Sequence, residues 1–158
     1  MHNIIRLIYL GYFFTHIPIT ILLDLQGLLP SSIYDALGVS NFFIWYHTAF
    51  DDHLMGTPPI WLKSFLFSEM VFQLPFFFVA VDALRKKKCS DLVKTLFIVY
   101  GTHTATTVLP ILADFIAASK YLLVAIYFPY FAIPLSLVFY FGLRKDPFCI
   151  EEGIKKAN

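Results

Sequence analysis

The stretch YLLVAIYFPYFAIPLSLVFYFGL, residues 121–143, contains no charged side chain. A helix needs ~20 mostly apolar residues to cross ~30 Å of hydrocarbon, so this stretch is long enough to span a bilayer. Three other segments are comparably long and apolar: about 4–23, 60–84 and 92–113. The sequence therefore predicts an all-α membrane protein in which residues 1–143 form a bundle of four transmembrane helices.

The composition of the 158-residue chain argues against the other classes of protein. Apolar and aromatic residues make up 58% of the chain and charged residues only 15%, against ~45–50% and ~25% in soluble domains. A soluble globule of this size cannot bury so much apolar surface, and a disordered chain would need the opposite balance. The formal net charge of +1 is too small for a basic nucleic-acid-binding face. A membrane protein without nucleic-acid partners is the class that remains.

The basic residues predict how the bundle is oriented. Of the 12 Lys and Arg residues, ten lie near the N-terminus, in the 85–94 connection or in the tail, residues 144–158. With four spans these three regions share one side of the membrane. Because Lys and Arg concentrate in cytoplasmic loops, we expect both termini to be cytoplasmic. Cys89 and Cys149 would then face a reducing compartment and remain thiols.

The chain ends in Lys155-Lys156-Ala157-Asn158. Lysines at the third and fourth positions from a cytoplasmic carboxyl terminus are typical of the dilysine retrieval signal of endoplasmic reticulum membrane proteins. Such a signal is read by a receptor and does not anchor the chain. An ordinary basic tail is the alternative. The sequence predicts a multi-pass protein of the endoplasmic reticulum membrane.

Ionisable side chains inside the spans predict a shared cavity. An acidic or basic group near the bilayer centre costs ~2.5–3.5 kcal/mol on insertion scales, so such groups face the bundle interior. Glu69 falls near the middle of the second span, with Gln73 one helical turn further on the same face. Comparable polar stripes run along the first, third and fourth spans: His16, Thr20 and Asp24; Tyr100, His103, Thr107 and Asp114; Tyr127 and Tyr130.

A buried pair of carboxyl groups is costly and rarely serves packing alone, so we expect Asp24 and Glu69 to carry function. Without a fixed cation, desolvation favours the neutral form of Glu69, which is then a hydrogen-bond donor. For His16 and His103 a packing role is favoured over that of a ligand or base. The only tight grouping of His and carboxylates along the chain is residues 51–53, a pattern typical of a solvated loop. We therefore expect neither a metal nor a cofactor.

The connection between the first two spans is unusually long. Residues 24–59 exceed an ordinary loop and carry aromatic residues suited to the membrane interface, Trp45 and Tyr46, with Trp61 directly after. We interpret the segment as an amphipathic lid over the cavity, with carboxylates that close it. A plain interfacial loop is the alternative.

A family resemblance runs through nearly the whole chain, in order and at matching spacing. The chain resembles the sigma-2 receptor family, which belongs to the EXPERA-domain membrane proteins together with the emopamil-binding sterol isomerases. The motifs that carry the resemblance are HIPIT (16–20), DLQ (24–26), Pro58-Pro59 with Trp61, KSFLF (63–67), Glu69 with VFQLPFF (71–77), His103-Thr104 with Thr106-Thr107, PIL (110–112), and Tyr127 with Pro129-Tyr130.

The resemblance implies a four-helix protein of the endoplasmic reticulum, often a homodimer, with a cavity that opens sideways to membrane lipid and binds a sterol or a cationic amphiphile. By matching position, Asp24 resembles the carboxylate that pairs with a ligand amine, and Glu69 its hydrogen-bonding neighbour. Asp52 resembles a carboxylate that holds the lid. The positions that resemble cavity-lining residues are Tyr46, Met55, Gln73, Thr107 and Tyr130. The chain departs from the family in residues 31–41, in residues 51–53 and in a shorter connection between the last two spans.

Three functions remain open. The first is a non-enzymatic ligand-binding protein of sterol and lipid homeostasis. The second is endoplasmic reticulum quality control of mitochondrial precursor proteins, to which small fungal members of the family are linked and which would require protein clients. The third is a sterol isomerase, in which Asp24 and Glu69 would shuttle a proton as acid and base. The resemblance is closer to the receptor branch, so catalysis ranks lower.

Overall fold

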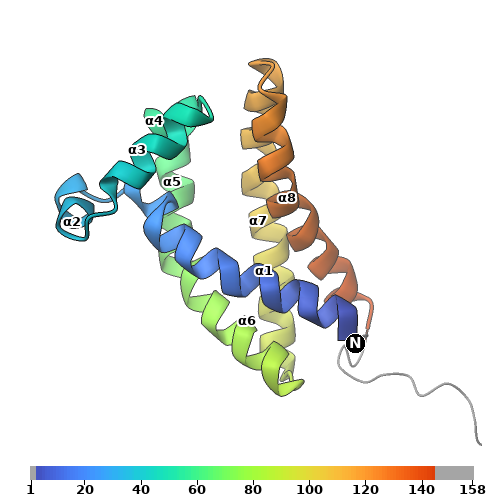
Figure 1. Cartoon of the computed structure of the whole chain (residues 1–158). Helices are drawn as coiled ribbons and strands as arrows, with labels where there is room; N and C mark the ends of the chain where they lie inside the picture. Colours follow the sequence, from blue (N-terminus) through green and yellow to red (C-terminus); the bar gives the residue numbers. More distant parts are fainter. Residues whose placement is uncertain (1–2, 145–158) are drawn as a thin grey trace, which may run out of the picture.

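The computed structural model describes residues 3–144, and within that range every regular element is a helix. Four helical segments are long and apolar enough to cross a membrane: Asn3–Gly27, Ile60–Lys86, Asp91–Ala117 and Tyr121–Gly142. The predicted four-span bundle is confirmed (Figure 1). The expected tail 144–158, with Cys149, Lys155 and Lys156, lies outside the described residues except for Arg144.

Two of the spans are composite. The first is α1 (Asn3–Leu22) followed by the 3-10 turn η1 (Asp24–Gly27). The second is α5 (Ile60–Ser68), the π-helical segment η2 (Glu69–Gln73) and α6 (Leu74–Lys86). The third and fourth are the continuous helices α7 (Asp91–Ala117) and α8 (Tyr121–Gly142).

The third span is longer than the sequence predicts. We expected it to end at residue 113, before a charge, but α7 continues through Asp114 to Ala117. The carboxylate does not end the helix because its Oδ2 lies 2.6 Å from Nε2 of His53 on the lid. The helix ends where Ser119 takes a left-handed conformation with a φ of 57°. The prolines also remain within their helices, as neighbouring helices in a bundle allow.

The helices α7 and α8 pack against each other at very short range. A Cβ atom placed on Gly101 would lie 2.5 Å from the carbonyl oxygen of Pro134 and 2.9 Å from Cγ2 of Val138. Only a residue without a side chain permits this approach of the two backbones. Beside this contact the rings of Phe97 and Phe141 stack with centroids 4.1 Å apart, and both side chains are fully buried.

The predicted lid consists of three short helices: α2 (Ser31–Ala36), α3 (Ser40–Ala49) and α4 (His53–Gly56). The helix α3 exposes Phe42 and Trp45, whose rings stack with centroids 5.6 Å apart. The helix α4 buries Leu54 and Met55 in a cluster that it shares with α5, α7 and α8. One side of the lid therefore exposes apolar side chains away from the bundle, and the other side packs against one end of the bundle.

The described chain ends lie at one end of the bundle. Figure 1 shows the N-terminus, the end of α6 and the end of α8 together, with the lid and the α7–α8 turn at the opposite end. The basic residues of the 85–94 connection therefore lie at the same end as both chain ends. The orientation relative to the cytoplasm stays a prediction.

Candidate ligand-binding cavity

A cavity of about 240 Å³ lies between the four spans and the lid. Its walls combine apolar side chains with a smaller number of polar groups. The residues that line it are His16, Ile19, Leu23, Asp24, Tyr46, Leu54, Met55, Leu62, Phe65, Leu66, Glu69, Gln73, Thr104, Thr107, Val108, Ile111, Ile126, Tyr127 and Tyr130. An apolar pocket with a few convergent polar groups has the form of a small-molecule site.

The structure brings all the residues expected around a ligand to this one cavity. They come from different elements: α1 with η1, the lid, η2, α7 and α8. The set is Asp24, Tyr46, Met55, Glu69, Gln73, Thr107 and Tyr130. Their place in the cavity wall is observed, whereas their role in binding stays a prediction.

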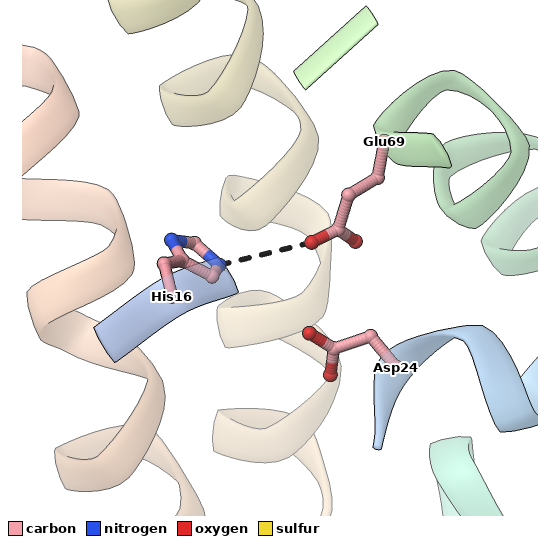
Figure 2. Close-up of side chains that lie close together, drawn as sticks. All are labelled: His16, Asp24 and Glu69. Atoms are coloured by element: carbon pink, nitrogen blue, oxygen red, sulfur yellow. Dashed lines mark ion pairs between the residues drawn. The ribbon is translucent and has the colours of Figure 1, made fainter. Parts of the chain in front are cut away.

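Three ionisable side chains meet within the cavity. One ligand atom each from His16, Asp24 and Glu69 lies within 4.8 Å of the other two, and Figure 2 shows the three side chains turned toward a common point. Glu69 is held by the hydroxyl of Thr20, which donates to its Oε1 at 2.7 Å. A hydrogen bond from Glu69 to Asp24 stays a prediction.

Local helix geometry places these groups. The chain leaves the α-helix at Leu22, and Asp24 opens the tighter 3-10 turn that follows. On the second span the N–H of Leu74 donates to the carbonyl of Glu69, five residues back, which is the π-helical pattern. Such one-turn π segments are frequent at functional sites. Both acidic groups therefore sit where the regular helix is interrupted.

A second polar network lies beside the acidic groups. Gln73 accepts a hydrogen bond from Thr104 at 3.1 Å, and its amide nitrogen lies 3.3 Å from Nδ1 of His103. The other ring nitrogen of His103 lies 2.9 Å from the hydroxyl of Ser68. His103 is thus the satisfied packing histidine that we expected. The sequence analysis missed Ser68, since no spacing within a single helix links it to His103.

His16 is packed as well, since its ring stacks on Phe77 with centroids 4.7 Å apart, but its ring nitrogens lack the hydrogen bonds that His103 makes. Only 6% of this residue is exposed, its Nδ1 has no hydrogen-bond partner, and its Nε2 lies 3.7 Å from Oε1 of Glu69. A tight grouping of His and carboxylates other than residues 51–53 does form in space. Within residues 3–144 the one such grouping is His16, Asp24 and Glu69, which are too far apart in the sequence for local spacing to reveal.

Asp52 fastens the lid to the fourth span. It is 1% exposed, its Oδ1 accepts from the backbone N–H of Met55 at 3.0 Å, and its Oδ2 accepts from the hydroxyl of Tyr127 at 2.8 Å. The hydroxyl of Tyr46 also donates to Oδ2, at 3.4 Å. Burial raises the pKa of Tyr46, so this hydroxyl keeps its proton as a donor.

The two neighbours of Asp52 hold the same end of the bundle. Asp51 accepts a hydrogen bond from Lys120 at 2.8 Å, and this lysine lowers the pKa of the exposed Asp51 carboxyl. His53 pairs with Asp114 at 2.6 Å. Three consecutive side chains thus bind different partners on α7, on α8 and in the turn between them, and so hold the lid in place.

Comparison with known proteins agrees with this geometry. The family model described as EXPERA (EXPanded EBP superfamily) matches residues 39–141. Sigma intracellular receptor 2 of Homo sapiens is 42% identical over 162 aligned positions, which cover 92% of this chain and 90% of the relative. The Xenopus tropicalis protein of the same name is also 42% identical, covering 86% of each chain. Efficient mitochondria targeting-associated protein 19 of Schizosaccharomyces pombe is 29% identical over 90% of this chain and 77% of the relative. The chain therefore belongs to the EXPERA family, as a relative of sigma intracellular receptor 2.

Proposed function

We propose that this protein binds a sterol or a cationic amphiphile in its intramembrane cavity and acts in sterol and lipid homeostasis at the endoplasmic reticulum. The observation that carries the proposal is the pair of carboxyl groups, Asp24 and Glu69, in the wall of a mostly apolar cavity within the membrane. The name of the relatives, sigma intracellular receptor 2, supports a receptor-like role.

The acidic pair suits a ligand with a positive charge. A carboxylate in a site of low dielectric forms strong, charge-assisted hydrogen bonds to an ammonium group. Ionised Asp24 would accept the N–H of the ligand, while Thr20 holds the adjacent Glu69 carboxyl in place. The aliphatic and aromatic walls would contact the apolar body of the ligand.

The size of the cavity favours a particular binding pose. Its volume of about 240 Å³ is slightly below the ~300–1,000 Å³ of sites that enclose a drug-sized ligand. A cationic amphiphile fits if its charged head lies at Asp24 and its apolar tail extends between the helices into the bilayer. A complete sterol needs an outward shift of the lid.

The amine-pairing role is tested by replacing Asp24 with Asn in the full-length protein in mild detergent. We expect the affinity for a radiolabelled cationic amphiphile to fall at least ~30-fold, since removal of one partner of a buried charge pair costs ~2–5 kcal/mol. Asp82→Asn is the matched control, because Asp82 is exposed and pairs with Lys86 at the other end of the bundle. Equal affinity in Asp24→Asn and Asp82→Asn would refute the role.

The natural ligand is identified by mass spectrometry of small molecules that co-purify with the protein. A sterol bound in wild type and lost in Asp24→Asn would support the sterol form of the proposal. Incubation of the same protein with a sterol that carries a shiftable double bond tests the isomerase alternative. A product formed by wild type and absent from both Asp24→Asn and Glu69→Gln would establish catalysis and overturn the receptor function.

The second candidate function is the handling of mitochondrial precursor proteins. It is favoured by the similarity to efficient mitochondria targeting-associated protein 19 of Schizosaccharomyces pombe and of Saccharomyces cerevisiae, at 29% and 32% identity. A tagged protein isolated from intact reticulum membranes should then enrich mitochondrial precursors. Enrichment that survives Asp24→Asn would separate this function from ligand binding in the cavity.

Location and assembly are further parts of the proposal. The dilysine-like end, Lys155 and Lys156, is the feature of the sequence that supports reticulum residence. Changing both to Ser should let the protein reach membranes beyond the endoplasmic reticulum, and unchanged reticulum staining would count against the signal.

The proposed homodimer rests on the family resemblance alone. Light scattering of the detergent-solubilised protein measures its oligomeric state.

A further inference from the structure

The cluster of His16, Asp24 and Glu69 offers more than a partner for an amine. Each residue contributes one potential metal-ligand atom, and these three atoms lie within 4.8 Å of one another inside the bundle. We propose that the three side chains form a binding site for a single divalent transition-metal ion, with zinc as the ion whose chemistry fits best.

The separation between His16 and Glu69 is close to that of two ligand atoms in a zinc site. Ligand atoms at the ~2.0–2.2 Å bond lengths of tetrahedral zinc lie about 3.4 Å from one another. Nε2 of His16 and Oε1 of Glu69 are 3.7 Å apart. In Figure 2 the imidazole and the two carboxyl groups point toward the same space from three separate elements, α1, η1 and η2.

The state of His16 points independently to a ligand. Its side chain is nine-tenths buried, its Nδ1 has no hydrogen-bond partner, and its Nε2 faces Glu69 at more than hydrogen-bond distance. A buried imidazole without partners is costly. His103, in contrast, has partners at both ring nitrogens. A metal bond at Nε2, the nitrogen that faces the carboxyl groups, would give this imidazole a polar partner, while Nδ1 stays without one.

The charges favour a dication. A single ammonium balances the pair while one carboxyl group keeps its proton, and leaves one negative charge uncompensated when both are ionised. A divalent ion neutralises both. The imidazole then selects among divalent ions, because calcium and magnesium prefer oxygen ligands alone, whereas a mixed nitrogen and oxygen set suits zinc and its neighbours in the transition series.

The surroundings also suit such a site. Thr20 is fully buried and donates to Oε1 of Glu69 at 2.7 Å, so it fixes the orientation of the carboxylate as outer-shell hydrogen bonds do in metal sites. Three protein ligands beside a cavity leave the fourth position of a tetrahedral ion open. The metal site shares Asp24 and Glu69 with the proposed amine site but does not depend on it.

The test uses the full-length protein in mild detergent, stripped with a chelator and dialysed against Zn²⁺. Elemental analysis should find about one zinc per chain in wild type, and Co²⁺ in place of zinc should give the intense visible bands of a tetrahedral site. His16→Phe should lower the zinc affinity at least ~100-fold and abolish the cobalt bands. His47→Phe, a matched histidine on the lid outside the cavity, should bind zinc like wild type.

A second pair of variants guards against loss of folding. Should His16→Phe elute as aggregate, His16→Gln and Glu69→Gln decide the question, with a single elution peak and the melting temperature as fold readouts. Wild type without stoichiometric zinc, or zinc binding retained in folded His16 variants, overturns the proposal. If the protein binds an amphiphile but no zinc, the metal site alone is overturned. If it binds zinc through His16 but binds no amphiphile, the proposed function alone is overturned.

Discussion

Asp52 is the buried acceptor that connects the lid to the bundle, and its replacement tests how much the lid depends on it. In Asp52→Asn one oxygen is lost, so the hydroxyls of Tyr127 and Tyr46 lose a charged acceptor. We expect a loss of ~1–3 kcal/mol in the free energy of unfolding, the usual cost of an unsatisfied buried group. Thermal unfolding in detergent measures it.

Asp51→Asn is the matched control for this change. Asp51 is exposed, and its left-handed φ of 51° suits Asn as well as Asp. Its pair with Lys120 is a surface contact, so we expect little change in melting temperature at neutral pH. Because Lys120 lowers the pKa of Asp51 below 3.8, this contact is present at neutral pH and is lost only as the pH falls through that lowered value. Equal destabilisation by both variants would contradict the role of Asp52.

At the scale of single residues the sequence located the acidic pair but not its partners. Asp24 and Glu69 were predictable because a carboxyl group in a span must face the interior. That Thr20 binds Glu69 and that His16 approaches it depend on how α1 crosses η2, a relation between helices that no spacing within one helix contains. The stripe of His16, Thr20 and Asp24 was the available signal.

The π-helical segment η2 gives a prediction at the scale of an element. A π turn holds one more residue than the α-helix it interrupts, so deletion of Val71 should restore a continuous α-helix. Four α-helical residues cover about the same arc as the five of the π turn, so α5 and α6 keep their register, while Glu69 and Gln73 come to be three residues apart instead of four and are re-aimed relative to the cavity. We expect a stable protein whose affinity for a cationic amphiphile falls at least ~10-fold.

The control for the deletion is Val71→Ala. Val71 is 58% exposed and does not line the cavity, so loss of its side chain should leave amphiphile binding as in wild type. Both proteins are compared by ligand titration and by their melting temperatures. A deletion variant with wild-type affinity would show that the π turn does not position Glu69.

The contact between α7 and α8 gives a second element-scale prediction. In Gly101→Ala the new methyl group would lie 2.5 Å from the carbonyl oxygen of Pro134, a backbone atom that cannot move aside without shifting the helix. We expect a loss of ~1–3 kcal/mol, as for overpacked cores, measured by thermal unfolding. Gly11→Ala meets no atom within 4 Å, so the gain in helix propensity should leave it unchanged or slightly more stable.

The sequence predicted the spans because hydropathy reports helix length directly, and the bounds of the first, second and fourth spans agree within a few residues. It missed η2, because a π turn differs from an α-helix only in which backbone carbonyl each N–H bonds, and the composition of residues 69–73 does not indicate this difference. It also ended α7 too early, because Asp114 has a hydrogen-bonding partner in His53, a residue 61 positions away.

At the scale of the whole molecule, the arrangement in Figure 1 predicts the membrane topology. The 85–94 connection and both described chain ends lie at one end, and the lid lies at the other. The chain has no Asn-x-Ser/Thr sequence of its own. A flexible insert with such a sequence after Gly38 should therefore become glycosylated, whereas the same insert after Lys87 should not. A glycosidase-sensitive mobility shift measures this, and the reverse pattern would invert the orientation.

The way the lid is fastened affects how ligands should be ranked. Residues 51–53 tie it to α7 and α8, so a ligand that enters past the lid must break these contacts, whereas one that enters between the helices, as the family resemblance implies, leaves them intact. A compound arriving by the second route first dissolves in the bilayer. Its apparent affinity in water is then the product of its membrane partition coefficient and its affinity for the cavity. Only affinities expressed per mole of lipid therefore compare how well different compounds fit the cavity.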